Sequence, residues 1–147
     1  MSTASRFACG PGNVEFAAAK SKDPSPIGRP ESGKALVYVV AVKSLALVRV
    51  GLDGAWVGAV NDTSSVSFAV DPGEHHLCAN WQSKAKDDPA MFAFRSFTAE
   101  SGKIYYFKTT VNSDETRMVL VKLQPLNEDE GRFLAAASAI SISNPKK

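Results

Sequence analysis

The residues best suited to chemistry lie in the segment Glu74 to Gln82, which contains both histidines and one of the two cysteines of the chain. Imidazole and thiol groups bind zinc or act in nucleophilic sites. On a strand, His76 and Cys78 point to one face and His75 to the other, so one strand offers at most two of these groups to a metal. A zinc site needs about four donors, and the only other such group is Cys9. We therefore predict no metal and no cofactor.

A hydrolase would need a serine or cysteine beside a histidine that a carboxylate orients. Ser64, Ser65 and Ser67 lie in a neighbouring segment, and we consider them for such a pairing with His75 or His76. The chain contains no Gly-x-Ser-x-Gly motif and no recognisable oxyanion loop. The sequence favours a protein without catalytic residues, with a small hydrolase as an alternative.

Large aromatic side chains form a second candidate site. Alternation along a strand places one of the adjacent residues Tyr105 and Tyr106 toward the core and the other outward. An outward tyrosine beside Trp81 would form a ligand or interaction face, together with His75 and His76. The structural alternative is cross-strand aromatic packing, which stabilises a sheet without any ligand.

Cys9 and Cys78 are the two cysteines of the chain, the smallest number that can close an intramolecular disulfide. Two separate buried thiols are the alternative. The residues alone leave both open.

The elements that carry these residues follow an all-β pattern from Lys34 onward. Short runs rich in Val, Phe, Tyr and Leu recur about every ten residues, with turn residues between them. Asp53-Gly54 is typical of a type I′ hairpin turn. The segment Ala35 to Val42 is almost continuously apolar, which predicts a central strand covered on both faces. The eight predicted strands are 35–42, 45–52, 55–60, 65–70, 74–82, 91–99, 103–111 and 116–124.

Two further segments flank these strands. Residues 1–33 include the proline-rich run Ser21 to Gly33 and are predicted to form an extended N-terminal arm, partly docked on the domain. After the last strand, Asn127 can cap a short helix with an acidic first turn. We expect an antiparallel β-sandwich over residues 34–147 that includes this C-terminal helix. The apolar face of the helix is predicted to contain Phe133, Leu134, Ala137 and Ile140.

Composition limits the classes of partner and compartment. The 147 residues include 17 Lys and Arg against 15 Asp and Glu, without a basic tract, so nucleic acid is not an expected partner. The longest apolar run is too short to span a membrane. Residues Met1 to Ser5 lack a signal-peptide pattern, so the protein is either cytosolic or an exported protein whose signal peptide is absent from this sequence.

Five segments together resemble a family of bacterial proteins, the domain-of-unknown-function family 2846. They are KALVYVV, VRVGLDGAWVG, SFAVDPGEHHLCA, FTAESGKIYYFK and NEDEGRFLAA, and the resemblance spans about residues 34–137. It implies an exported or lipid-anchored β-sandwich, periplasmic or extracellular, for which no activity is established. Cys9 follows Arg6-Phe7-Ala8 and not a lipobox, so we expect no lipid on this cysteine.

Export favours a disulfide between Cys9 and Cys78, because disulfides persist in oxidising compartments. Such a bridge would tie the arm to the sandwich and would stabilise the fold by about 4 kcal/mol on the chain-entropy account. We therefore expect a non-enzymatic exported domain that binds another envelope or secreted protein. A small-ligand or metal-binding domain around His75 and His76 is the alternative.

Overall fold

The computed structural model describes residues 8–21, 27–44, 46–82, 89–113 and 119–146, which form two β-sheets and one α-helix. The larger sheet has the spatial order β1 (Phe16–Lys20), β10 (Ala139–Pro145), β5 (Ser64–Val70), β2 (Ala35–Ala41), β8 (Ile104–Ser113) and β9 (Val119–Leu126). The smaller sheet has the order β4 (Ala55–Val60), β3 (Val48–Leu52), β6 (Gly73–Trp81) and β7 (Phe92–Ala99). Helix α2 spans Glu128–Ala137, and a 3-10 turn, η1, spans Pro89–Met91.

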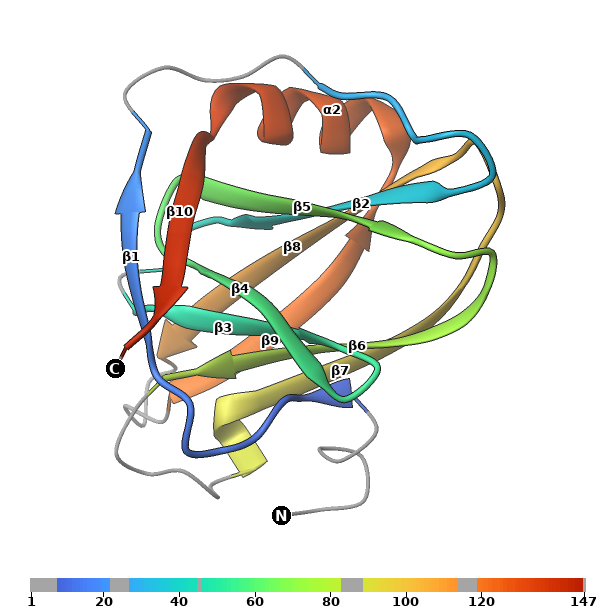
Figure 1. Ribbon diagram of the computed structural model, residues 1–147. Helices are drawn as coiled ribbons and strands as arrows, with labels where there is room; N and C mark the ends of the chain where they lie inside the picture. The colour runs from blue at the N-terminus through green and yellow to red at the C-terminus, as the bar shows by residue number, and fades with distance from the viewer. Residues whose placement is uncertain (1–7, 22–26, 45, 83–88, 114–118, 147) are drawn as a thin grey trace.

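The two sheets pack face to face around one apolar core (Figure 1). Val37 of β2 and Phe107 of β8 meet Leu77 of β6 in this core. Alternate residues of a strand point to opposite faces, so Tyr38 of β2 lies on the outer face of the larger sheet, in the apolar cluster beneath α2. Strand β2 is buried on both faces and lies inside the sheet, as its apolar sequence predicted.

Two local predictions are confirmed by the backbone. Asp53 and Gly54 both have positive φ, 52° and 92°, as a type I′ turn between β3 and β4 requires. Asn127 is the N-cap of α2, and its side chain accepts a hydrogen bond from the backbone N–H of Glu130 at 2.8 Å. Both signals act within a few residues and depend little on the rest of the fold.

The predicted end of the helix is wrong, and of its predicted apolar face only Leu134 packs in the cluster beneath the helix. The helix ends at Ala137, and Ile140 belongs to strand β10. The side of the helix that faces the sheet carries Gly131 and Ala135, whereas Phe133 is 72% exposed. A small residue is needed at position 131, because a Cβ atom there would lie 2.3 Å from the ring of Tyr106.

The prediction of two antiparallel sheets holds only for the smaller sheet. In the larger sheet β2 runs parallel to β8, and β10 runs parallel to β5, so this sheet is mixed. The partners of each parallel pair are far apart in the chain and several other elements lie between them. The side-chain pattern of a strand does not encode the direction of its neighbour.

Two strands of the structure were not predicted. Strand β1 has the sequence FAAAK and lies in the predicted arm, and β10 has the sequence AISISNP and follows α2. They pair antiparallel with each other, so this part of the arm is an edge strand of the larger sheet. The predicted strand starts at Leu45 and Thr116, and residues 1–7 and 22–26 of the arm, lie outside the described residues. Within the described ranges no helix has the length and apolar character needed to cross a membrane.

Candidate functional site

The candidate site lies where the last strand of one sheet passes the last strand of the other. Strand β7 ends the smaller sheet and β9 ends the larger one. In the described structure the ladder partners of these strands are β6 and β8, so no backbone ladder joins β7 to β9. Pro125 suits such an edge, because proline has no N–H to donate to a ladder. We call residues 93–97 of β7 and 122–126 of β9 the open seam.

Arg95 connects the two strands in the middle of the open seam. It lies opposite Leu77 in the register of the smaller sheet, and its side chain therefore begins on the core side of the edge strand. Its Nε–H donates a hydrogen bond to the carbonyl oxygen of Leu123 in β9 at 2.8 Å. An inward-placed charge on an edge strand also hinders pairing with another sheet, which is a structural role for the same residue.

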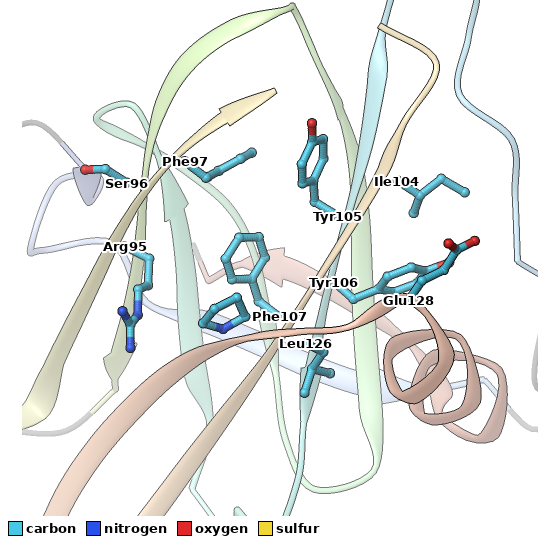
Figure 2. A pocket seen from close by; sticks show the side chains of 10 residues that line it. Arg95, Ser96, Phe97, Ile104, Tyr105, Tyr106, Phe107, Leu126 and Glu128 are labelled. Carbon is cyan, nitrogen blue, oxygen red and sulfur yellow. The ribbon is translucent and has the colours of Figure 1, made fainter. Parts of the chain in front are cut away.

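A pocket lies on each side of Arg95. The aromatic pocket has a volume of about 250 Å³ and is bounded by β7, β8, β9 and the start of α2 (Figure 2). Phe97, Phe107 and Leu126 form part of its walls, and Glu128 lines it on the opposite side from Arg95. The second pocket, of about 270 Å³, lies further along the open seam. We call it the basic pocket, since Arg95 and Lys122 line it together with Ala93, Phe94, Leu123 and Gln124.

The rings of the aromatic pocket support one another. The ring of Phe97 lies 5.2 Å from that of Phe107 and 5.5 Å from that of Tyr105, at interplanar angles of 57° and 47°. These tilted arrangements are favourable between aromatic rings. The hydroxyl oxygen of Tyr105 also accepts a hydrogen bond from the backbone N–H of Glu100 at 2.9 Å. These contacts position the three rings relative to one another.

His75 contacts Phe97, a residue of the pocket wall, but does not itself line the aromatic pocket. Its ring is 5.7 Å from that of Phe97. The Nδ1 atom is 2.5 Å from a carboxylate oxygen of Asp53, and Nε2 is 2.6 Å from the carbonyl oxygen of Asp71. Both neighbours are acceptors, so both ring nitrogens must donate, which requires the imidazolium form. His75 thereby joins the β3–β4 turn to the β5–β6 turn.

The pKa of His75 reflects this environment. Burial lowers the pKa, but the hydrogen bonds to Asp53 and to the Asp71 carbonyl outweigh burial and raise it overall. Asp71 also forms an ion pair with Lys34 at 2.9 Å. The polar surroundings of the ring are structural and do not face the aromatic pocket.

His76 points to the outer face of the smaller sheet, as alternation predicts. Its Nδ1 is 3.0 Å from Oγ of Ser96, and its Nε2 is 4.0 Å from a carboxylate oxygen of Glu74. These residue types match those of a hydrolase triad, but 4.0 Å exceeds hydrogen-bond distance. The His76 side chain is 42% exposed and does not line the aromatic pocket.

The serines considered for catalysis lie elsewhere. Ser64 donates a hydrogen bond to the carbonyl of Asn61, and Ser65 accepts one from Ser138. Both serines are buried in the larger sheet, whereas the histidines belong to the smaller one. Ser67 lies on the same strand and is exposed. This geometry does not favour the hydrolase alternative.

The predicted interaction face is divided among separate places. His75 and Trp81 lie toward opposite ends of β6, and Trp81 packs against the core. Tyr106 faces α2 and stacks on Tyr38 at 5.6 Å, while Tyr105 packs toward the core. Tyr105 and Tyr106 both line the aromatic pocket, so they are the part of the predicted face that belongs to the candidate site.

Cys9 and Cys78 form a disulfide, which confirms their predicted pairing. Both are buried, and they pack with Ala8, Trp56 and Phe92 on the outer face of the smaller sheet. The bridge fixes residues 8–14, which we call the strap, against this face. Figure 1 shows the strap crossing the smaller sheet beside β6 and β7.

Arg49 of β3 binds the strap through hydrogen bonds. It is 4% exposed, and its guanidinium donates to the side-chain oxygen of Asn80 from Nε and Nη2 and to the carbonyl of Val14 from Nη1. The ring of Trp56 lies 4.2 Å from the guanidinium carbon, and its Nε1–H donates to the carbonyl of Pro11. Asn80 of β6 and the carbonyl groups of the strap together satisfy this polar cluster.

Sequence reasoning missed most of the open seam. One signal was present in β7, where Arg95 interrupts an alternating set of otherwise apolar or small residues, Ala93, Phe97 and Ala99. A charge on the apolar face of a strand indicates an edge or a functional position. A second signal was Pro125 near the end of β9, which excludes a central strand.

Two observations bear on the class of the protein. Within the described ranges, no three His, Cys, Asp or Glu side chains are grouped so that they could hold a metal ion. Comparisons with family models, with the curated proteins and with the solved structures found no match to this chain.

Proposed function

We propose that this protein is a non-enzymatic bacterial domain, exported to the periplasm or the cell surface, that binds a segment of another envelope or secreted protein in the open seam. The observation that carries the proposal is the pair of pockets on the two sides of Arg95, between the edge strands of both sheets. A bound segment would lie along β7 and β9.

The size and arrangement of the pockets favour a polypeptide over one larger molecule. Their volumes, about 250 and 270 Å³, are each below the roughly 300 Å³ at which pockets for drug-sized ligands begin. Two pockets along a strand fit alternate side chains of an extended peptide, which point to the same side. Edge strands also offer backbone groups to an added chain.

Export is supported by the buried disulfide, since such bridges form and persist outside the reducing cytosol. The resemblance to family 2846 agrees with this compartment. A non-enzymatic role is supported by the aromatic pocket, because neither histidine lines it and its charged groups, Arg95 and Glu128, lie on opposite sides.

Selection from a phage-displayed library of random peptides on the oxidised protein tests the proposal. We expect enriched peptides whose affinity, measured by fluorescence anisotropy, falls about tenfold in the Arg95→Gln variant, because a charge-assisted hydrogen bond is worth about 1.4 kcal/mol or more. Lys20→Gln removes the same charge from β1, at the other edge of the larger sheet, and should leave the affinity unchanged. A library that yields no binding peptide, or peptides that bind wild type and Arg95→Gln equally, would contradict the proposal.

A further inference from the structure

The volume of the aromatic pocket limits what it can hold. At about 250 Å³ it exceeds a cavity of roughly 150 Å³ that binds benzene and is smaller than a drug-sized site of about 300 Å³. It therefore fits a single ring. The tilted rings of Phe97, Tyr105 and Phe107 present faces and edges to an entering aromatic ring.

The positive charge of Arg95, at one end of the aromatic pocket, favours an anionic ligand. Arg95 lines both pockets, and Lys122 lines the basic pocket beside it. The guanidinium has further N–H donors on its terminal nitrogens, in a fork that matches a carboxylate. The acidic group of the aromatic pocket, Glu128, lies on the opposite side and faces Arg132 at 4.0 Å.

The aromatic ring of Phe97 and the charge of Arg95 lie close together along β7. Arg95 and Phe97 are two positions apart on the same face of β7, a separation of about 7 Å along the strand. One residue can span this distance when its aromatic side chain enters the pocket and its own α-carboxylate faces the guanidinium. An interior residue of a peptide has no such carboxylate.

We propose that the aromatic pocket and Arg95 bind the C-terminal aromatic residue of a partner polypeptide, with the ring in the pocket and the terminal carboxylate on the guanidinium. The inference rests on the proposed function and names the part of the partner that is recognised. The remainder of the partner chain would lie along the open seam.

The test compares a labelled peptide Gly-Ser-Gly-Ser-Phe with a free carboxylate and the same peptide with a C-terminal amide, by fluorescence anisotropy on the full oxidised chain. We expect the acid to bind at least tenfold more tightly than the amide, which is about 1.4 kcal/mol. Arg95→Gln should remove this difference, and Lys20→Gln should preserve it. Since the acid and the amide are compared on the wild-type protein, the result does not depend on how well a variant folds.

Three outcomes would overturn the inference. These are equal affinity of acid and amide, no binding of either peptide, and binding of 3-phenylpropionate as tight as that of the peptide acid, which would assign the pocket to a free aromatic acid. If library peptides without a C-terminal aromatic residue still depend on Arg95, the proposed function holds while the recognition of a C-terminus fails.

Discussion

The two sheets of the sandwich contact each other at two sides, and the contact differs between these sides. Between β4 and β10, the backbone N–H of Ala59 donates to Oγ of Ser143 at 3.0 Å, and Oγ of Ser141 donates to the carbonyl of Ala59 at 2.5 Å. We call this contact the closed seam. Gly58 permits the close approach, because a Cβ there would lie 3.2 Å from the Ser143 hydroxyl. The open seam is instead bridged by one long side chain, Arg95, with a pocket on each side.

With the proposed function, this difference assigns stability to one seam and recognition to the other. Short hydroxyl side chains of β10, the neighbour of the edge strand β1, bond the backbone of the edge strand β4. At the open seam a long guanidinium bridges the edge strands β7 and β9, with side-chain-sized space on each side of it. Substitutions in the closed seam should therefore change the free energy of unfolding, and substitutions in the open seam should change peptide affinity.

The largest effect is expected from the bridge that fixes the strap. Removing it in a Cys9→Ala/Cys78→Ala double variant should lower the free energy of unfolding by about 4 kcal/mol, since it closes a loop of 69 residues. Urea unfolding of the variant and of the oxidised protein gives the difference. Peptide affinity at the open seam should not change while the protein is folded. A loss below about 1 kcal/mol would show that the strap is not a main support of the fold.

The hydroxyls of the closed seam come next. Ser141→Ala/Ser143→Ala should lower the free energy of unfolding by about 2 kcal/mol, because each change removes a hydrogen bond worth about 1 kcal/mol. Ser67→Ala, at an exposed position of β5, is the matched control and should have no effect. Equal stability of the double variant and the control would remove the distinction between the seams.

Arg95→Gln should show the opposite behaviour. Arg95 is exposed and contributes one hydrogen bond to Leu123, so the stability loss should stay near 1 kcal/mol. Peptide affinity should fall about tenfold. Parallel urea and anisotropy measurements separate the two effects. A variant that loses stability as strongly as the double serine variant but binds normally would assign Arg95 to the scaffold.

The contribution of His75 to stability should depend on pH. The pKa of His75 is raised above its ordinary value of about 6.5, so its stabilising effect is complete below that value and is lost as the pH rises through the folded-state pKa. The thermal midpoint of wild type should fall with rising pH in this range relative to His75→Gln. Asp71 and Lys34 stay charged there, because their ion pair lowers the pKa of Asp71 and raises that of Lys34. Parallel curves for the two proteins would show that the ring is not held as an imidazolium.

The smallest effect is expected at Phe133. This side chain is 72% exposed on α2 and lines neither pocket of the open seam. Phe133→Ser should change stability by less than about 0.5 kcal/mol and leave peptide affinity unchanged. A tenfold loss of affinity would move the recognition surface from the open seam to the helix.

Local signals were sufficient for much of the fold. The Asp53-Gly54 turn, the Asn127 cap and the buried strand Ala35–Ala41 each depend on a few neighbouring residues. Strand β1 gave little signal, because three of its five residues are alanine. Strand β10 was missed because Ile140 was assigned to the helix, although isoleucine and serine alternate over residues 140–143 as in a strand.

The site was less accessible to sequence reasoning than the fold. Tyr105 and Tyr106 were candidates by residue type, and both line the aromatic pocket. The importance of Arg95 depends on β9 lying beside β7, which joins segments from different sheets. No pattern within either strand encodes that contact. The histidines attracted attention because their chemistry is versatile, but their positions are set by turns and by an exposed sheet face.

NMR chemical-shift mapping of a library-selected peptide on the isotopically labelled protein would show which seam binds. We expect the largest amide shifts at Arg95, Phe97 and Leu126 in the open seam, with little change at Ala59 and Ser143. Shifts concentrated at the closed seam, or on α2 around Phe133, would contradict the division of the molecule into a seam for stability and a seam for binding.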